Sequence, residues 1–265
     1  MTFEDKRIIL TGAAGGIGTA LAKQLAAEGA RLALADLNTK GLDSVAEACR
    51  VLGGETLVHP TDVSDREQCR TLIARTVETW GGIDVLFSNA GISMWARFED
   101  VTDISIYERL MAVNYFGALY CTYYALPYLK ESRGMLVVVT SSSGKTGAPL
   151  HSGYAASKHA LHGFFESLRT ELVGSGVQIT LVVPLFVATG IRLRGFQGNG
   201  SHPSVDPYDD SKSMSADQVA RIAIKAAKKG KREAIVTLEL KAAVKLRPFI
   251  PGIVDSFARR KVGLQ

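Results

Sequence analysis

Short apolar runs rich in β-branched residues alternate along this chain with longer amphipathic stretches. The apolar runs are short enough to be buried strands, and they cover residues 7–11, 31–36, 56–59, 85–88, 135–141 and 178–183. Helical periodicity fills the intervals at residues 16–28, 42–51, 66–80, 104–130 and 154–173. Strands that alternate with helices form right-handed βαβ units around a parallel sheet. The pattern therefore predicts a doubly wound α/β fold, with about seven parallel strands flanked by helices on both faces.

The alternating pattern is unbroken to about residue 183 and then changes. Residues 189–213 carry four Gly and two Pro residues and few large apolar ones. Long irregular loops are usually functional, and this one follows the carboxyl end of a strand, where α/β proteins bind ligands. We expect residues 185–213 to form a substrate loop. No internal boundary is visible, so residues 1–265 are interpreted as a single domain.

The remaining chain predicts a helix over residues 215–229, with Ser215 as its N-cap, and a short strand at 234–237. Residues 238–265 form an apolar and basic C-terminal extension, which Pro248 and Pro251 interrupt. Three roles are open for it: to cover a pocket, to join a subunit interface, or to touch a membrane surface.

The net charge is +5 and the isoelectric point is near 9.1, with much of the excess late in the chain. A basic surface can bind nucleic acid or membranes. No nucleic-acid-binding module is recognisable, so solvated helix faces around a site for an anionic cofactor are favoured. No apolar run approaches the roughly 18 residues that span a bilayer. We therefore expect neither a nucleic-acid partner nor membrane insertion.

Three cysteines, with no CxxC pair among them, predict neither a zinc site nor a disulfide framework. We expect no bound metal. The charged start of the chain runs directly into the first strand without the pattern of a signal peptide. A reducing cytoplasm is the expected compartment.

A glycine-rich turn, Thr11-Gly12-Ala13-Ala14-Gly15-Gly16-Ile17-Gly18, joins the first predicted strand to the first predicted helix. Such a turn lets backbone approach a pyrophosphate, while the helix N-terminus offers N–H groups and a positive dipole end. The strand–turn–helix context supports this interpretation. A tight turn with no ligand is the alternative.

Asp36 ends the second predicted strand, 20 residues after Gly16. A carboxylate there would accept hydrogen bonds from the adenosine ribose hydroxyls and would repel a 2′-phosphate. Neither position 15 nor position 37 carries a Lys or Arg to compensate. The sequence favours NAD(H) over NADP(H), although a solvated Asp at a strand end has the same pattern.

Tyr154 and Lys158 are four residues apart and project from the same face of a predicted helix. A tyrosine that acts as a base near neutral pH needs its pKa lowered by about 2–3 pH units. The Lys158 ammonium and an oxidised nicotinamide have the sign to lower it. Ser141, 13 residues before Tyr154, can donate a hydrogen bond to a substrate oxygen. The adjacent Ser142 is a rival, and Asn114 could be merely a polar residue inside a helix.

Taken in order, these motifs resemble those of the short-chain dehydrogenase/reductase family, from Lys6 to about Thr189. The resemblance includes the catalytic tetrad Asn114, Ser141, Tyr154 and Lys158. It implies a Rossmann fold. It also implies a set of cofactor-binding residues: Gly12, Gly15, Gly16, Ile17, Gly18, Asp36, Leu37, Asp62, Val63, Asn89, Ala90, Gly91, Tyr154, Lys158, Pro184, Val187 and Thr189.

The resemblance also implies individual roles. Lys158 would bind the nicotinamide ribose, and Asn114 would hold a water that links Lys158 to solvent. The chain departs from the family at Leu185, where the family usually has Gly after Pro184. That side chain would narrow the pocket or shift the loop.

The substrate pocket is less legible. The expected substrate residues are Ser93, Ser143, His151 and Phe186, with Met94, Trp95 and residues 191–196 as further candidates. Arg192 and Arg194 could bind an acidic group, but we expect them to face water. The mixture of apolar and polar groups suits a secondary alcohol or ketone with hydrophobic bulk.

We expect an NAD(H)-dependent oxidoreductase in which Tyr154 is the general acid and base. A non-enzymatic dinucleotide-binding redox sensor is the alternative, although a pure binder has no need of Tyr154. A nucleotide-sugar epimerase or dehydratase would need a larger C-terminal domain than this chain has. The resemblance further implies a homodimer or homotetramer. It also relates residues 238–260 to the C-terminal segments of some family members with hydrophobic substrates.

Overall fold

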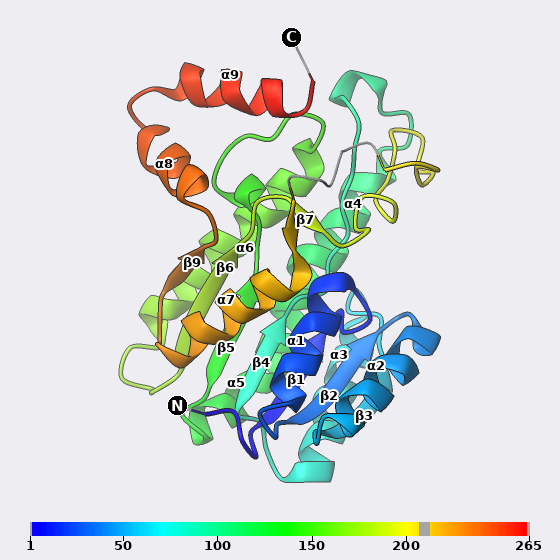
Figure 1. Ribbon diagram of the computed structural model, residues 1–265, viewed down its shortest axis with the longest axis vertical. Coiled ribbons are helices and arrows are strands. Elements are labelled where there is room, and N and C mark those ends of the chain that lie inside the picture. Colours follow the sequence, from blue (N-terminus) through cyan, green and yellow to red (C-terminus); the bar gives the residue numbers. More distant parts are fainter. Residues whose placement is uncertain (1, 207–212, 264–265) are drawn as a thin grey trace.

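A parallel sheet forms the centre of the computed structural model, which describes residues 2–206 and 213–263 (Figure 1). Within these residues the sheet has seven strands in the order β3-β2-β1-β4-β5-β6-β9, and every neighbouring pair is parallel. The strands are β1 (Arg7–Thr11), β2 (Arg31–Asp36), β3 (Glu55–Pro60), β4 (Val85–Ser88), β5 (Met135–Val139), β6 (Gln178–Val183) and β9 (Glu233–Ile235). The strand order reverses between β1 and β4, as in a doubly wound fold. The predicted fold class is confirmed.

Helices cover both faces of the sheet. One face carries α1 (Gly16–Ala26), α2 (Thr39–Val51) and α7 (Ala216–Lys228), and the other carries α3 (Arg66–Trp80), α5 (Gly117–Glu131) and α6 (Ser152–Glu171). Side chains alternate along each strand. In β1, Ile8 and Leu10 pack into the first layer, whereas Ile9 packs into the second. Helices bury both faces of the sheet, which explains the unbroken apolar runs of the strands.

The helix predicted over residues 104–130 is present in three consecutive pieces. They are α4 (Ser105–Met111), a π-helical turn η2 (Ala112–Phe116) and α5. Such π-turns are frequent at functional sites, and this one carries Asn114. The strand predicted over 135–141 ends at Val139, because Ser141 instead caps a short 3-10 helix, η3 (Ser142–Gly144).

The predicted substrate loop begins with β7 (Val187–Ala188), which pairs in parallel with β8 (Met214–Ser215). Residues 207–212 of this loop lie outside the described residues. Ser215 caps α7 as predicted: its side chain accepts a hydrogen bond from the Gln218 N–H at 3.2 Å, and Gln218 Oε1 accepts one from the Ser215 N–H at 3.1 Å. This reciprocal capping box holds the end of the loop at the start of a buried helix.

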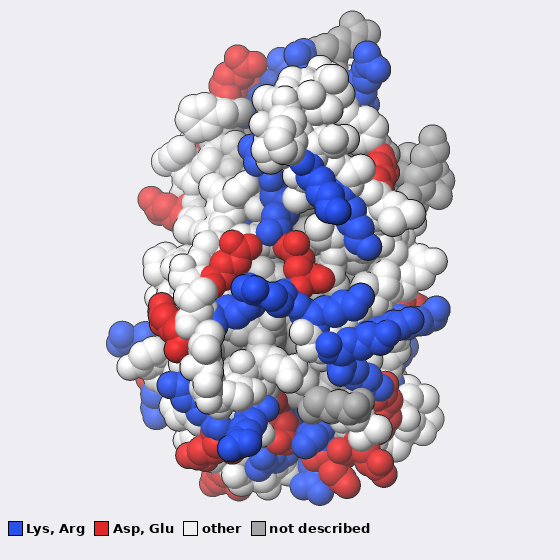
Figure 2. All heavy atoms as spheres, turned by 90° about the vertical axis from the view of Figure 1, so that its left-hand side faces the viewer, with Lys and Arg blue, Asp and Glu red and all other residues white. Residues whose placement is uncertain are grey.

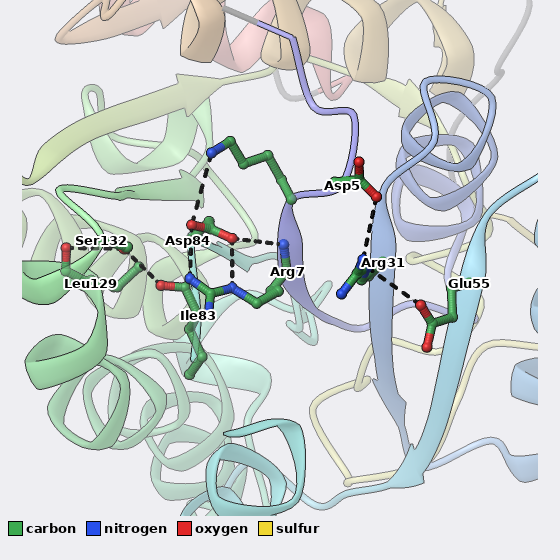
Figure 3. Close-up of polar contacts among 9 residues, drawn as sticks. Asp5, Arg7, Arg31, Glu55, Ile83, Asp84, Leu129 and Ser132 are labelled. Carbon is green, nitrogen blue, oxygen red and sulfur yellow. Dashed lines mark hydrogen bonds and ion pairs between the residues drawn. The ribbon is translucent and has the colours of Figure 1, made fainter. Parts of the chain in front are cut away.

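Ion pairs tie the strands together at their amino ends (Figure 3). Arg7 donates to Asp84 from its backbone N–H at 2.9 Å and from Nε at 2.8 Å, which joins β1 to the start of β4. Burial raises the pKa of Asp84, but the hydrogen bonds from Arg7 outweigh it, so the pKa lies below its usual value. This edge is opposite the carboxyl ends of the strands and serves stability.

Two further helices follow the sheet, α8 (Leu238–Leu246) and α9 (Pro251–Lys261). Thr237 caps α8 by accepting a hydrogen bond from the Leu240 N–H at 3.2 Å. Both helices lie beyond the carboxyl ends of the strands, at the top of Figure 1. They are therefore on the side of the sheet where a ligand would bind.

Candidate active site

A cavity of about 490 Å³ lies at the carboxyl ends of the strands. Its volume is within the range of small-molecule sites. It extends from the end of β2 across the glycine turn to the first turn of α6, and on to the substrate loop and α9. Every predicted cofactor-binding residue lines it, as do the four expected substrate residues Ser93, Ser143, His151 and Phe186. The fold thus brings both groups to one continuous surface.

The glycine turn after β1 is crowded by backbone. Gly12 has a φ of +66°, and a Cβ there would lie 2.8 Å from the Cα of Ala90. A Cβ on Gly18 would collide with the carbonyl oxygen of Gly12. Asn89 holds the turn from β4, because its Nδ2 donates to the carbonyl oxygens of Thr11 and Gly12, each at 3.0 Å. Only glycine allows this close packing, which leaves the start of α1 open to a phosphate group.

Asp36 closes the other side of the turn. Its carboxylate accepts hydrogen bonds from the Ala14 N–H and the Asn38 N–H, each at 3.0 Å. The next side chain, Leu37, is 68% exposed and carries no charge. A ribose placed against Asp36 would therefore lie beside a carboxylate, with no Lys or Arg at position 15 or 37.

Tyr154, Lys158 and Ser141 meet at the centre of the cavity. Tyr154 lies on the first turn of α6. The side chain of Ser141 acts to lower its pKa, which favours Ser141 over Ser142. The Ser141 Oγ also accepts from the Ser143 N–H at 3.2 Å. Lys158 Nζ donates to the Val139 carbonyl at 3.2 Å and lies 5.6 Å from the ring centroid of Tyr154.

Burial sets the protonation of this pair. It lowers the pKa of Lys158 from its usual 10.5 to about 8. It raises the pKa of Tyr154, and the side chain of Ser141 opposes that change only partly. The sequence predicts a lowered pKa for Tyr154. The protein groups alone give the opposite direction, because desolvation of the phenol outweighs its polar contacts.

Asn114 lies behind the cavity and does not line it. Its Nδ2 donates to the Ile92 carbonyl at 3.0 Å and to Ser157 Oγ at 2.9 Å, while its Oδ1 accepts from the Ile92 N–H at 2.8 Å. A Cβ on Gly91 would lie 3.1 Å from Asn114 Oδ1 and 3.4 Å from Lys158 Nζ. Asn114 therefore fixes the backbone beside Lys158, and its part in a water relay stays a prediction.

The substrate end of the cavity contains His151, whose Nδ1 lies 2.9 Å from the Pro149 carbonyl. Burial lowers its pKa. The prediction that Met94, Trp95 and Phe196 line the pocket is wrong. Met94 and Phe196 form a β-bridge and pack into a separate apolar cluster, and Trp95 packs edge-on against His151 at 4.9 Å. These three residues pack behind the side chains that line the cavity.

The two arginines of the loop differ from each other. Arg192 is 6% exposed, and its Nε lies 2.7 Å from Asp206 Oδ1, so the expectation that it faces water is wrong. Arg194 is exposed as expected, yet its Nη2 donates to the Thr189 carbonyl at 3.2 Å. Both line the cavity, as does Leu185, which stands where the family has glycine.

The C-terminal extension supplies cavity residues that the sequence analysis did not name. In the structure the extension contributes residues to the wall of the cavity, which is compatible with the first of its three open roles. The residues that line the cavity are Glu239, Leu240, Ala243, Val254, Phe257, Ala258 and Val262. Their spacing of three and four residues within each helix is the signal that could have found them.

The outer side of the extension is apolar and basic. Leu238 and Phe249 are each 81% exposed. Figure 2 views the molecule from the side that carries α8 and α9, and it shows Lys and Arg side chains beside uncharged surface. No described helix is both long and apolar enough to cross a bilayer.

One group of potential metal ligands occurs among residues 2–206 and 213–263, formed by His162, Glu166 and Glu233. Lys145 Nζ lies 2.7 Å from Glu233 Oε1 and 3.2 Å from Glu166 Oε1. An ammonium thus already balances the carboxylates. The cysteines are free, as expected, although Cys69 and Cys121, far apart in sequence, contact each other.

Comparison with known proteins identifies the class that this fold and cavity define. The family model of the short chain dehydrogenases matches residues 6–198, so the chain belongs to the short-chain dehydrogenase/reductase family. It is 43% identical over 185 residues to an 11-beta-hydroxysteroid dehydrogenase-like protein of Arabidopsis thaliana, covering 69% of this chain and 60% of that protein. It spans between 52% and 62% of the length of four such relatives.

Two longer matches extend the comparison over nearly the whole chain. A dehydrogenase/reductase family protein 7-like protein of Dictyostelium discoideum is 32% identical over 262 residues, covering 96% of this chain and 81% of that protein. A short-chain dehydrogenase/reductase from Burkholderia phymatum, solved in complex with NAD, superposes with a TM-score of 0.86 at 26% identity and covers 96% of each chain. The nucleotide-binding Rossmann fold is thus common to this chain and its relatives.

Proposed function

We propose that the protein is an NAD(H)-dependent oxidoreductase that interconverts a secondary alcohol and a ketone, with Tyr154 as general acid and base. The placement of Tyr154, Ser141 and Lys158 together on the wall of one cavity is the observation that carries the proposal. A reacting oxygen between the two hydroxyls would meet both a proton donor and a second hydrogen bond.

The residues fit a dinucleotide. The crowded Gly12–Gly18 turn would hold the diphosphate at the start of α1, and Asp36 would hold the adenosine ribose. Lys158 would reach the nicotinamide ribose from the other end of the same cavity. When bound, the nicotinamide supplies or accepts the hydride. The carboxylate of Asp36, without a cation at position 15 or 37, supports NAD(H) over NADP(H).

In the reducing direction the carbonyl oxygen gains negative charge as a C–H bond forms at its carbon. Tyr154 donates its phenolic proton to that oxygen while Ser141 Oγ–H stabilises the charge. In the oxidising direction Tyr154 accepts the proton of the alcohol. Because burial brings the pKa of Lys158 to about 8, its ammonium can favour the phenolate below that pH.

Apolar walls support a substrate with hydrophobic bulk. Leu185, Phe186 and Ile191 from the loop face the cavity together with Leu240 and Phe257 from the extension. Ser143 and His151 are the polar groups on this side. A compact ketone with one or two polar atoms and an apolar body matches this lining.

A panel of ketones and secondary alcohols, assayed by the absorbance of NADH, tests the proposal. We expect turnover of hydrophobic substrates and little turnover of small hydrophilic ones. Absence of turnover with every member, despite NADH binding, would favour the redox-sensor alternative.

A cytoplasmic location and a homodimer or homotetramer also belong to the proposal. The oligomeric state depends on the family resemblance, and the location is supported by the free cysteines. The helices expected to pair, over residues 104–130 and 154–173, are α4 to α5 and α6. Light scattering of the purified protein tests the oligomeric state.

A further inference from the structure

The guanidinium of Arg194 lies over the glycine turn, at the phosphate end of the cavity. A Cβ on Gly15 would lie 3.9 Å from Arg194 Nη2, and one on Gly190 would lie 3.5 Å from Nη1. Nη2 also donates to the Thr189 carbonyl at 3.2 Å. Arg194 is therefore held beside the turn although it belongs to the substrate loop.

The guanidinium of Arg194 differs from that of Arg192 in its ionic partners. Among the described residues, no carboxylate forms an ion pair with it, whereas Arg192 is paired with Asp206. The start of α1 adds N–H groups that have no acceptor within the helix, and a positive dipole end. A guanidinium and a helix N-terminus that face one space suit a diphosphate, since the planar fork of arginine matches phosphate oxygens.

The segment that carries Arg194 is fixed at its other end to the substrate side. Phe196 N–H donates to the Ser93 carbonyl at 2.9 Å, and Trp95 N–H donates to the Phe196 carbonyl at 2.8 Å. Ser93 lines the cavity. A contact between Arg194 and a bound diphosphate would therefore fix the same loop that builds the substrate wall.

We infer that Arg194 is a cofactor-binding residue whose guanidinium contacts the diphosphate of the dinucleotide and holds the loop over it. The inference rests on the proposed function for the presence of the dinucleotide. It assigns Arg194 to the cofactor and not to an acidic substrate.

Binding to full-length Arg194→Gln tests this inference, with NADH, ADP-ribose and adenosine as probes. ADP-ribose contains the diphosphate without the nicotinamide, and adenosine lacks both phosphates. We expect NADH and ADP-ribose to bind about ten- to hundredfold more weakly than to the wild type, and adenosine to bind equally well. Arg194→Lys keeps the charge but loses the planar, forked guanidinium. Its affinity for NADH and ADP-ribose should lie between those of the wild type and Arg194→Gln.

Arg221→Gln, at an exposed position on α7, is the matched control for the lost charge and should bind all three probes as the wild type does. A second readout is the salt dependence of NADH affinity, which should be shallower for Arg194→Gln.

Unchanged affinity of Arg194→Gln for NADH and ADP-ribose, or an equal loss for adenosine, would overturn the role of Arg194 alone. A wild type that binds neither NADH nor ADP-ribose would overturn the proposed function, and the role of Arg194 with it.

Discussion

The side chain of Thr189 packs directly against Gly16: a Cβ on Gly16 would lie 2.7 Å from Thr189 Cβ and 2.9 Å from its Cα. The start of the substrate loop thus lies on the first residue of α1. At this point the loop and the phosphate turn approach so closely because position 16 lacks a side chain. Any change that separates them disturbs the cofactor and substrate ends of the cavity together.

Gly16→Ala is therefore expected to push Thr189 away and to weaken NADH binding by about tenfold or more. Gly163→Ala is the control, because nothing lies within 4 Å of its Cβ on α6. That variant should keep its NADH affinity and gain about 1 kcal/mol of stability from the better helix former. Fluorescence titration and thermal unfolding measure both effects. Wild-type NADH affinity in Gly16→Ala would contradict the account.

Asp36→Asn tests the cofactor preference, since it removes the charge and keeps one of the two oxygens that accept from the Ala14 and Asn38 N–H groups. We expect the wild type to bind NADH about tenfold or more tightly than NADPH, and the variant to lose most of that preference. Asp43→Asn, exposed on α2, changes the net charge equally and should leave the ratio unchanged. If the wild type binds both cofactors equally well, the role given to Asp36 is wrong.

Lys158→Met is expected to alter the pH dependence of stability. Burial lowers the pKa of Lys158 from 10.5 to about 8, so between these pH values the unfolded chain holds a proton that the folded protein has released. The free energy of unfolding of the wild type should therefore rise with pH across this window, relative to the variant. The change is on the order of 3 kcal/mol.

Urea unfolding of both proteins over this pH window measures the difference. Lys229→Met, at an exposed position just after α7, is the control. Its free energy of unfolding should change with pH in parallel with that of the wild type. Parallel curves for Lys158→Met and the wild type would show that Lys158 keeps an ordinary pKa.

Phe257→Ala tests whether α9 covers the pocket. Phe257 lines the cavity and is 43% exposed, so its loss should raise the KM for a bulky hydrophobic ketone by about tenfold. Affinity for NADH should not change. Phe249→Ala, at a residue that is 81% exposed, serves as the control. Equal effects of the two substitutions on KM would count against a covering role for α9.

The sequence predicts the strands, helices and turns well, because these elements depend on residues that are close together in the chain. The turn from Gly12 to Gly18 and the cap at Ser215 depend on residues close in sequence. The choice between Ser141 and Ser142 needed the orientation of adjacent side chains, which spacing does not contain. The burial of Arg192 depends on Asp206, a tertiary contact with no periodicity. The pKa of Tyr154 depends on desolvation by the folded surroundings, which the neighbouring residues in the sequence do not reveal.

The central claim is that Tyr154 moves the proton in the reaction. The most direct test compares turnover and NADH affinity of Tyr154→Phe with those of the wild type, using the best ketone from the panel. The account predicts that turnover falls by about 10²- to 10⁴-fold, while the dissociation constant for NADH stays within about twofold, because the ring and its packing remain. Wild-type turnover in Tyr154→Phe would contradict the account.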